Sequence, residues 1–279
     1  MVVEPSPRGY DRRLVPESLL IRTWNIAHGR DVPPGAEHGH VRRKLLREMA
    51  RVMIEDDPDV VLLQEVPVWA ADLLREHTGM GVTLAPTYGA HIPFVHVPLP
   101  LAVGAAVGRA LPDLVRTQVE GQAQAILYGP ALLLVSARRV QLNERTRLRG
   151  EPRIAQLARL RHRRAGRELV IANVHADPGG DEQLEKAGFV LERFARGAPM
   201  VLAGDLNADM QSAGVHALRA RGFVEESGEV GIDHVLVRGF EMEWAATRSL
   251  PERRDLRHNG SRPVRLSDHD PVDAVVSFA

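Results

Sequence analysis

Short apolar runs and helical apolar patterns alternate along the first third of the chain. Residues 19–24 and 59–65 form apolar runs that predict strands, and the second run is buried on both faces because four consecutive apolar residues leave no solvated side. Residues 41–54 place apolar side chains at helical spacing among charged ones, and residues 69–77 predict a second helix. The order strand, helix, strand, helix is typical of an α/β domain.

The middle of the chain predicts strands, and the remainder returns to alternation. Residues 122–127 and 131–142 are predicted to form a hairpin that turns at Gly129 and Pro130, and residues 154–162 to pair with residues 168–175. Further elements follow: helices at 181–196 and 213–221, and strands at 200–203, 232–237, 241–247 and 272–278. No repeat or linker interrupts them. We therefore expect one catalytic domain over residues 19–279, preceded by a poorly ordered extension at 1–18.

Residues 91–112 form an apolar segment interrupted by proline and glycine. The segment is too short and broken to span a membrane, which takes roughly 20 uninterrupted apolar residues. Residues 99–111 within it are compatible with a short helix. The simpler interpretation is a loop and helix packed on the core. The alternative is a wall or lid beside a substrate.

Composition limits the class of protein. The chain has 279 residues, balances 36 basic against 36 acidic residues, and contains no cysteine. Balanced charge provides no global attraction to nucleic acid or to an anionic membrane, so any such affinity must be local. The absence of cysteine excludes disulfides, thiolate metal sites and a cysteine nucleophile. The first residues lack an apolar signal region, so we expect a cytoplasmic protein, and we expect it to be a monomer.

Polar groups suited to phosphate chemistry follow several of the apolar runs. They lie in five short segments: Thr23-Trp24-Asn25, Leu63-Gln64-Glu65-Val66, Asn173-Val174-His175, Gly204-Asp205-Leu206-Asn207-Ala208-Asp209 and Ser267-Asp268-His269-Asp270-Pro271-Val272. Residues at the ends of neighbouring strands converge in space however far apart they are in sequence. We therefore predict a single site.

Three of these residues suit a metal ion and its shell. Glu65 offers the hard carboxylate oxygen that Mg²⁺ prefers, Asn25 can orient metal-bound water or phosphate, and Asp268 could join the metal shell. Mn²⁺ is a possible substitute for Mg²⁺.

The remaining groups suit the attacking water and the phosphate. Gly204 allows a sharp turn that presents Asp205 and Asn207 to one side. Asp205 could deprotonate water while Asn207 donates to the developing oxyanion, and His175 and His269 could donate to phosphate oxygens. Each residue alone has a simpler explanation, such as a turn cap, a surface charge or a buried histidine. Their occurrence together at strand ends favours catalysis.

These motifs resemble the endonuclease/exonuclease/phosphatase family, whose fold is that of pancreatic deoxyribonuclease. The resemblance covers nearly the whole chain from about residue 19. It rests on Thr-Trp-Asn-Ile-Ala-His-Gly at 23–29, Leu-Gln-Glu-Val at 63–66, Asn-Val-His at 173–175, Gly-Asp-Leu-Asn at 204–207, Ile-Asp-His at 232–234 and Ser-Asp-His-Asp-Pro-Val at 267–272.

The resemblance implies a four-layer α/β sandwich of two packed mixed β-sheets flanked by helices, with the site at one mouth. It also assigns roles. Asn25 and Glu65 would serve the metal and Asp268 the metal region, whereas His175 and Asn207 would bind the phosphate. Asp205 would activate the water, His269 would contact the scissile phosphate, Asp233 would orient His269, and Arg153 would hold a substrate phosphate.

The substrate is less constrained. Nucleases of the family often have a tyrosine or asparagine where this chain has Gln122 and Gln124, and many relatives have an aromatic residue at the position of His234. Aromatic residues are only 4% of the chain, which gives no evident stacking platform. Arginines are dense between residues 138 and 167, and could grip a polyanion or simply line a solvated sheet face.

Three hypotheses result. The leading one is a Mg²⁺-dependent phosphodiesterase acting on DNA or RNA. The second is a phosphatase, or a sphingomyelinase- or inositol-phosphate-type phosphoesterase acting on a lipid or small phosphorylated substrate, which the balanced charge and the apolar segment 91–112 favour. The third, a binding module without activity, is disfavoured because no catalytic position is replaced.

Overall fold

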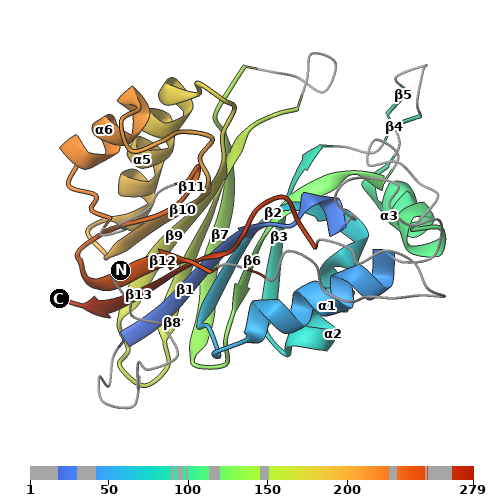
Figure 1. Ribbon diagram of the computed structural model, residues 1–279, viewed down its shortest axis with the longest axis horizontal. Coiled ribbons are helices and arrows are strands. Elements are labelled where there is room, and N and C mark those ends of the chain that lie inside the picture. The colour runs from blue at the N-terminus through green and yellow to red at the C-terminus, as the bar shows by residue number, and fades with distance from the viewer. Residues whose placement is uncertain are drawn as a thin grey trace, which may run out of the picture.

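The computed structural model describes residues 18–29, 42–88, 91–92, 97–98, 100–112, 120–144, 151–225, 231–248, 250 and 266–279. Two sheets pack face to face, with helices on both outer sides (Figure 1). This is the four-layer α/β sandwich that the resemblance implied. The expected N-terminal extension lies outside the described residues, apart from Ser18.

The first sheet has six strands in the order β12-β13-β1-β2-β6-β3. Their bounds are Phe240–Thr247 (β12), Val272–Phe278 (β13), Ser18–Asn25 (β1), Val60–Pro67 (β2), Gln122–Tyr128 (β6) and Gly81–Tyr88 (β3). Only β1 and β2 pair in parallel; the other neighbours in this sheet are antiparallel. The carboxyl ends of β1 and β2 therefore lie at the same edge.

The second sheet has five strands in the order β11-β10-β9-β8-β7. Their bounds are Asp233–Arg238 (β11), Met200–Asp205 (β10), Glu168–His175 (β9), Ile154–His162 (β8) and Leu132–Gln141 (β7). Here β9 and β10 form the parallel pair. Each sheet thus has one parallel pair, and the short strands β4 (His91–Ile92) and β5 (Val97–Pro98) form a separate two-stranded ribbon.

Amphipathic helices cover the outer faces of both sheets (Figure 1). Helices α1 (Arg42–Ile54) and α2 (Ala71–Thr78) pack on the six-stranded sheet, whereas α5 (Asp181–Ala195) and α6 (Ala213–Ala220) lie over the five-stranded one. Two 3-10 helices, η3 (Ala27–Gly29) and η4 (Val68–Ala70), follow β1 and β2, and α3 (Leu101–Ala110) packs near η4. Among the described residues, no helix has the length and apolar character needed to cross a membrane.

Three apolar layers hold the four structural layers together. The central layer lies between the sheets and includes Ile21, Leu62, Ile171, Val201 and Val235, all with no exposed surface. Separate clusters join each sheet to its helices. Because β1 faces β10 and β2 faces β9 across the central layer, the ends of the two parallel pairs meet at one mouth.

Most predicted elements are confirmed, including the hairpin of β8 and β9 and the short helix within residues 99–111. The hairpin predicted at residues 122–142 is wrong. β6 pairs with β2 and β3, and β7 pairs with β8 in the other sheet, so the chain crosses between sheets at Gly129 and Pro130. The Gly129 amide donates to the carbonyl of Asp59 at 2.8 Å, which ties this crossing to the start of β2.

Candidate active site

Residues from both parallel pairs form the site. Asn25 is the last residue of β1, Glu65 lies near the end of β2, and His175 and Asp205 end β9 and β10. Strand register aligns His175 with Asp205, and Asp205 with Asp233 at the start of β11. Side chains at matching register positions share a face, so all three of these groups can meet the groups from the first sheet.

A bulge in β2 sets the direction of Glu65. The pairing of β2 with β6 shifts register between Leu63 and Val66, and Glu65 has a left-handed φ of 55°. Bulges next to functional sites redirect side chains, and non-glycine residues with positive φ are costly unless the surrounding structure imposes them. Ala27, His28 and Asn207 also have positive φ, so strained backbone is concentrated around this site.

Gly204 allows β10 to pass close to β9 immediately before Asp205. Its φ is +145°, and a Cβ atom there would lie 1.8 Å from the carbonyl oxygen of Val174. Any other residue would force the two strands apart. The glycine that the sequence predicts at this turn therefore fixes the position of Asp205 beside His175.

The Asn25 amide connects the two carboxylates of the site. Its Nδ2 donates to Asp205 Oδ2 at 3.0 Å and approaches Glu65 Oε1 at 3.4 Å. Its oxygen accepts the backbone N–H of Ala27 at 3.1 Å. With the oxygen engaged in this way, Asn25 presents donors to the site and orients both carboxylates.

The two carboxylates have opposite electrostatic character. Burial and the charge of Asp233 together raise the pKa of Asp205 to about 6, against the opposing effect of the Asn25 hydrogen bond. Burial also acts to raise the pKa of Glu65, but the hydrogen bond and charge of His28 outweigh it and lower the value to about 2. Glu65 is thus a fixed anion, whereas Asp205 can exchange a proton near neutral pH.

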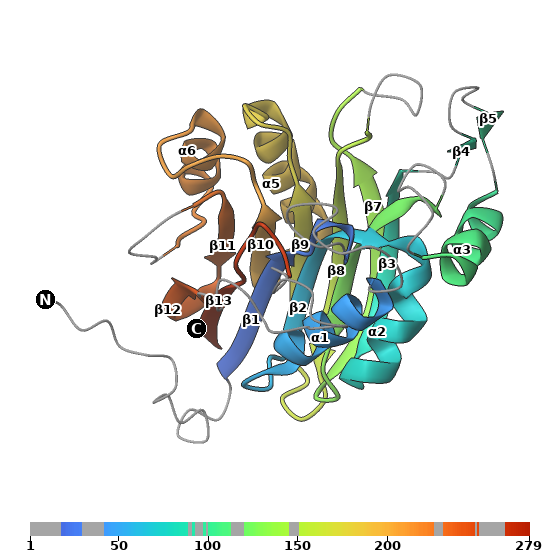
Figure 2. The same ribbon diagram turned by 45° about the vertical axis from the view of Figure 1, so that its right-hand side comes forward.

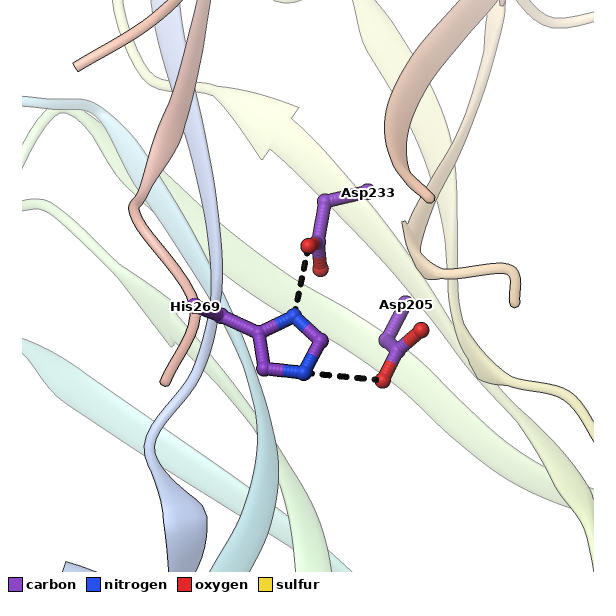
Figure 3. A group of neighbouring side chains, drawn as sticks. All are labelled: Asp205, Asp233 and His269. Atoms are coloured by element: carbon purple, nitrogen blue, oxygen red, sulfur yellow. Dashed lines mark hydrogen bonds and ion pairs between the residues drawn. The ribbon is translucent and has the colours of Figure 1, made fainter. Parts of the chain in front are cut away.

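His269 lies between two carboxylates (Figure 3). Its Nδ1 is 2.6 Å from Asp233 Oδ2, and its Nε2 faces Asp205 Oδ2 at 3.8 Å. Burial lowers the pKa of His269, but the hydrogen bond and charge of Asp233 prevail and raise it to about 9. The ring is therefore an imidazolium at neutral pH, with Nδ1–H donating to Asp233 and Nε2–H directed toward Asp205.

His175 contributes a second, neutral ring near the same oxygen of Asp205. Its Nε2 is 3.4 Å from Asp205 Oδ2. Burial, reinforced by the charge of Arg153, lowers the pKa of His175 to about 3. One oxygen of Asp205 therefore has a neutral imidazole and a charged imidazolium as neighbours.

Asn207 closes the turn after β10. Its backbone N–H donates to Asp205 Oδ1 at 3.1 Å, and its side-chain Nδ2 donates to the carbonyl of Ala176 at 3.0 Å. An amide nitrogen carries two hydrogens, so one remains to donate to a ligand.

The loop before β13 is fixed to the end of β1. The Ser267 hydroxyl donates to the Asn25 carbonyl at 2.6 Å and accepts the His269 backbone N–H at 3.1 Å. Trp24 Nε1 donates to the His269 carbonyl at 2.9 Å. Asp268 is exposed on this loop, with its Oδ1 3.4 Å from the Ser267 hydroxyl oxygen, which places it beside the first sheet.

Arg153 lies at the mouth with its charge already engaged. Its Nε donates to Asp177 Oδ1 at 2.8 Å, and its Nη1 to Glu151 Oε2 at 3.3 Å. Glu151 also accepts a hydrogen bond from Gln122. A phosphate bound by Arg153 would have to share the guanidinium with these carboxylates.

No role was predicted for His28, which contacts Glu65. His28 Nε2 is 2.9 Å from Glu65 Oε2, and its backbone carbonyl accepts two hydrogen bonds from Arg42. Arg42 is in turn held by the buried carboxylate of Glu120 at 2.6 Å. His28 stands in the Ala-His-Gly segment after β1, so its proximity to Asn25 in sequence was the available signal.

Polar side chains also bridge the sheets beneath the site. Gln64 Nε2 donates to Asn173 Oδ1 at 2.7 Å, and Asn173 Nδ2 donates to the carbonyls of Leu63 and Ala125 at 2.9 and 3.0 Å. Both side chains are fully buried. The first polar residue in each of these two strand-end motifs thus fixes how β2 and β9 face each other.

Two groups of side chains could hold a cation. Ligand atoms of Asp205, Asp233 and His269 lie within 4.8 Å of one another. However, the Asp233 carboxylate already binds the His269 imidazolium, and a cation there would compete with that proton. Glu65 is ionised, partly exposed and provides the oxygen ligands that Mg²⁺ prefers, so the donor chemistry favours the Glu65 side of the site.

Several solved structures share this fold at low sequence identity. A mannosyl-6-phosphatase from Bacteroides thetaiotaomicron VPI-5482 has a TM-score of 0.66 at 17% identity, with 93% of this chain and 100% of that chain covered. An endonuclease/exonuclease/phosphatase family protein from Bacteroides thetaiotaomicron has a TM-score of 0.65 at 17% identity, with 94% and 95% covered. The human Nocturnin catalytic domain with bound sulfate has a TM-score of 0.62 at 18% identity, with 94% of each chain covered.

The sequence itself identifies the family. No curated protein sequence matches the chain significantly. The family model described as endonuclease/exonuclease/phosphatase family matches residues 23–269, which span the site from the end of β1 to His269. The chain therefore belongs to the endonuclease/exonuclease/phosphatase family, and is a hydrolase acting on phosphate ester bonds.

Proposed function

We propose that the protein is a Mg²⁺-dependent phosphodiesterase that cleaves DNA or RNA by attack of an activated water, with Mn²⁺ able to replace Mg²⁺. The observation that carries this proposal is the position of Asp205. One of its oxygens lies within 3.0 to 3.8 Å of Asn25, His175 and His269, and burial raises its pKa to about 6. A general base is most effective when its pKa lies near the working pH.

Residues of the five-stranded sheet carry out proton transfer and charge stabilisation, together with His269 from the loop before β13 of the six-stranded sheet. Ionised Asp205 accepts a proton from water as the water oxygen bonds to phosphorus and the opposite ester bond breaks. The His269 imidazolium and the His175 N–H stabilise the negative charge that gathers on the phosphoryl oxygens. Asp233 keeps His269 charged and oriented, and Asn207 supplies a further amide donor.

The residues of the six-stranded sheet serve the metal ion. Glu65 is the ligand, Asn25 orients its carboxylate, and Asp268 lies on the same side of the site. A bound divalent cation would neutralise the phosphate oxygens and stabilise the departing alkoxide. Arg153 binds a flanking phosphate of the substrate while sharing its charge with Asp177 and Glu151.

A phosphatase or a lipid- or inositol-phosphate-type phosphodiesterase is the second candidate. The observation that favours it is α3, where Val103 is 45% exposed and the adjoining Leu111 is 49% exposed. Together they offer an apolar surface to a lipid. The mannosyl-6-phosphatase among the similar structures belongs to the phosphatase side of the family.

Nicking of supercoiled plasmid tests the proposal. We expect purified protein to nick the plasmid with Mg²⁺ or Mn²⁺, and to lose this activity in EDTA and in Asp205→Asn. Asp209→Asn is the matched control, because Asp209 lies in the same turn but is exposed and bonds only locally, to the N–H of Gln211 at 2.8 Å and to that of Ser212 at 3.1 Å. An intact plasmid, together with metal-dependent hydrolysis of phosphorylated lipids, inositols or sugars, would replace the nuclease by the second candidate.

A further inference from the structure

A groove lies on the outer face of the five-stranded sheet, away from Asp205. It encloses about 780 Å³ between β7, β8 and α5. Helix α5 packs against β8, β9 and β10, and β7 is the edge strand beyond β8 (Figure 2). Most of β7 is exposed there, because no described helix covers it.

Arginines give this groove a positive charge. Arg138, Arg159, Arg193 and Arg196 line it, against the single carboxylate of Glu168. Glu168 is paired with Arg159 at 2.8 Å and with Arg161 at 2.6 Å. Arg159 also donates to the carbonyls at the end of α5, so its role is structural.

The other three arginines keep their charge available. Within the described part of the chain, Arg138, Arg193 and Arg196 have no carboxylate partner, and all three are exposed. Arg138 lies 5.6 Å from the ring centre of Phe194, and Arg193 lies 5.7 Å from that of Phe189. Aromatic rings thus hold two of the guanidinium groups in place while leaving their N–H groups free for an anion.

Exposed apolar side chains accompany these charges. Phe189 is 46% exposed and Val135 is 43% exposed, and both line the groove. A ligand that fits must therefore carry both negative charges and flat or apolar parts. Single-stranded nucleic acid has this composition, since its phosphates alternate with unstacked bases.

The register places the upper end of the groove close to the mouth of the site. Val140 in the groove pairs with Ala155, and Ala155 pairs with Val174, the residue before His175. Val140 and Val174 are therefore separated by two strand spacings, which is about 10 Å. Arg153 directly precedes β8 at the same edge. A nucleic-acid strand that leaves the active site past Arg153 can therefore enter the groove.

We propose that this groove binds single-stranded nucleic acid on one side of the cleavage site, through phosphate contacts of Arg138 and Arg193 and base contacts of Phe189. The proposal rests on the proposed function, because it assigns the groove to a longer portion of the same substrate. It also gives the arginines between residues 138 and 167 different roles: Arg159 is structural, whereas Arg138 contacts substrate. Arg145, Arg147 and Arg149 lie outside the described residues.

Fluorescence anisotropy in EDTA tests binding without cleavage. The probe is a fluorescein-labelled single-stranded 20-mer, with a 4-mer for comparison. We expect the double variant Arg138→Gln, Arg193→Gln to bind the 20-mer about tenfold more weakly and to reduce the slope of log Kd against log salt by about 1.4, for two lost contacts. Arg196 is left in place because it ends α5 with a φ of 51°.

A control of equal charge separates the groove from general electrostatics. Arg47→Gln, Arg219→Gln removes two exposed arginines from α1 and α6, and binding should stay within about twofold of wild type. Phe189→Ser should weaken 20-mer binding about fivefold but reduce the salt slope by less than the double arginine variant does, because Arg193 loses its aromatic contact and keeps its charge. The 4-mer should bind equally to all variants, because it reaches only the mouth.

Each alternative result overturns one of the proposals. Equal 20-mer affinity of the groove variant and the control variant would overturn the groove. Displacement of the 20-mer by polyglutamate as effective as displacement by unlabelled 20-mer would assign the groove to acidic peptides instead. If the groove variants weaken binding but the protein cleaves no nucleic acid in Mg²⁺, the groove proposal stands and the nuclease proposal is rejected. If the protein cleaves nucleic acid but the groove variants bind the 20-mer as wild type does, the nuclease proposal stands and the groove proposal is rejected.

Discussion

The two sheets contribute different chemistry to one site. The six-stranded sheet supplies Glu65, whose pKa is lowered to about 2, and the five-stranded sheet supplies Asp205, whose pKa is raised to about 6. A single amide, that of Asn25, reaches both carboxylates. Two carboxylates so close together have different protonation behaviour because each has a different histidine and carboxylate neighbour. In our account the first sheet binds the cation, whereas the second sheet carries the proton-accepting Asp205, which faces His269 from the loop before β13.

Replacement of Asp205 should have the largest effect, because it removes the base from the second sheet. Asp205→Asn keeps the size of the side chain and its oxygen, and we expect kcat to fall by about 10⁴. Steady-state hydrolysis with saturating Mg²⁺ measures this loss. A kcat within tenfold of wild type would show that Asp205 is not the group that accepts the proton from water.

Asp233→Asn should cost less, since Asp233 acts through His269. Its carboxylate accepts the His269 Nδ1–H at 2.6 Å, and an amide there can bind the ring in the wrong tautomer. We expect kcat to drop about 10²-fold with little change in KM. A purely structural role would instead show as a lower melting temperature with kcat preserved in the folded fraction.

The sequence predicts which residues meet at the site better than it predicts which sheet each strand joins. Strand-end motifs placed Asn25, Glu65, His175 and Asp205 together because parallel strands end at one edge, and the structure brings these residues together. Local patterns could not tell which sheet β7 joins, because a turn at Gly129 suits both a hairpin and a crossing between sheets. β3 was missed because Gly81 and Pro86 weaken its strand signal.

Tertiary contacts explain the remaining gaps. The bulge that turns Glu65 and the left-handed loop that brings His28 to it depend on packing, such as that of Gly29, where a Cβ would lie 2.5 Å from Leu46. The Gln64 to Asn173 bridge joins residues in different sheets, which no local pattern indicates. Likewise, alternation alone could not distinguish the structural Arg159 from the available Arg138.

His28→Ala tests whether the six-stranded sheet binds the metal ion through Glu65. His28 holds one oxygen of Glu65 at 2.9 Å, and loss of a group that orients a metal ligand typically lowers affinity about tenfold or more. We expect half-maximal activity to require about ten times more Mg²⁺, with kcat restored at saturation. His216→Ala, an exposed histidine on α6, is the control. Tighter Mg²⁺ binding would mean that His28 competes with the ion.

The smallest expected effect concerns the buried pair of His234, on β11 of the second sheet, and Glu225. His234 Nδ1 is 2.9 Å from Glu225 Oε2 and its Nε2 is 2.7 Å from the Ala208 carbonyl, so both nitrogens face acceptors. Burial lowers the pKa of His234, but the Glu225 hydrogen bond and charge prevail and raise it. The ring thus anchors the turn that follows Asp205.

The sign of the pH dependence follows from that raised pKa. The pair contributes its full stability below about pH 6.5, which is the ordinary pKa of histidine. This contribution is lost as the pH rises through the higher pKa that His234 has in the folded protein. We expect the urea midpoint to fall between pH 6 and 9 more in wild type than in His234→Phe, Glu225→Gln. Parallel curves for the two proteins would show that the pair is not charged.

Calorimetric titration of Mg²⁺ into two variants tests the division between the sheets most directly. We expect Glu65→Gln to lose measurable Mg²⁺ binding, and Asp205→Asn to bind Mg²⁺ within a few-fold of wild type while being inactive. If Asp205→Asn loses the ion and Glu65→Gln keeps it, the metal site lies in the Asp205, Asp233 and His269 group, and our assignment of the two sheets is reversed.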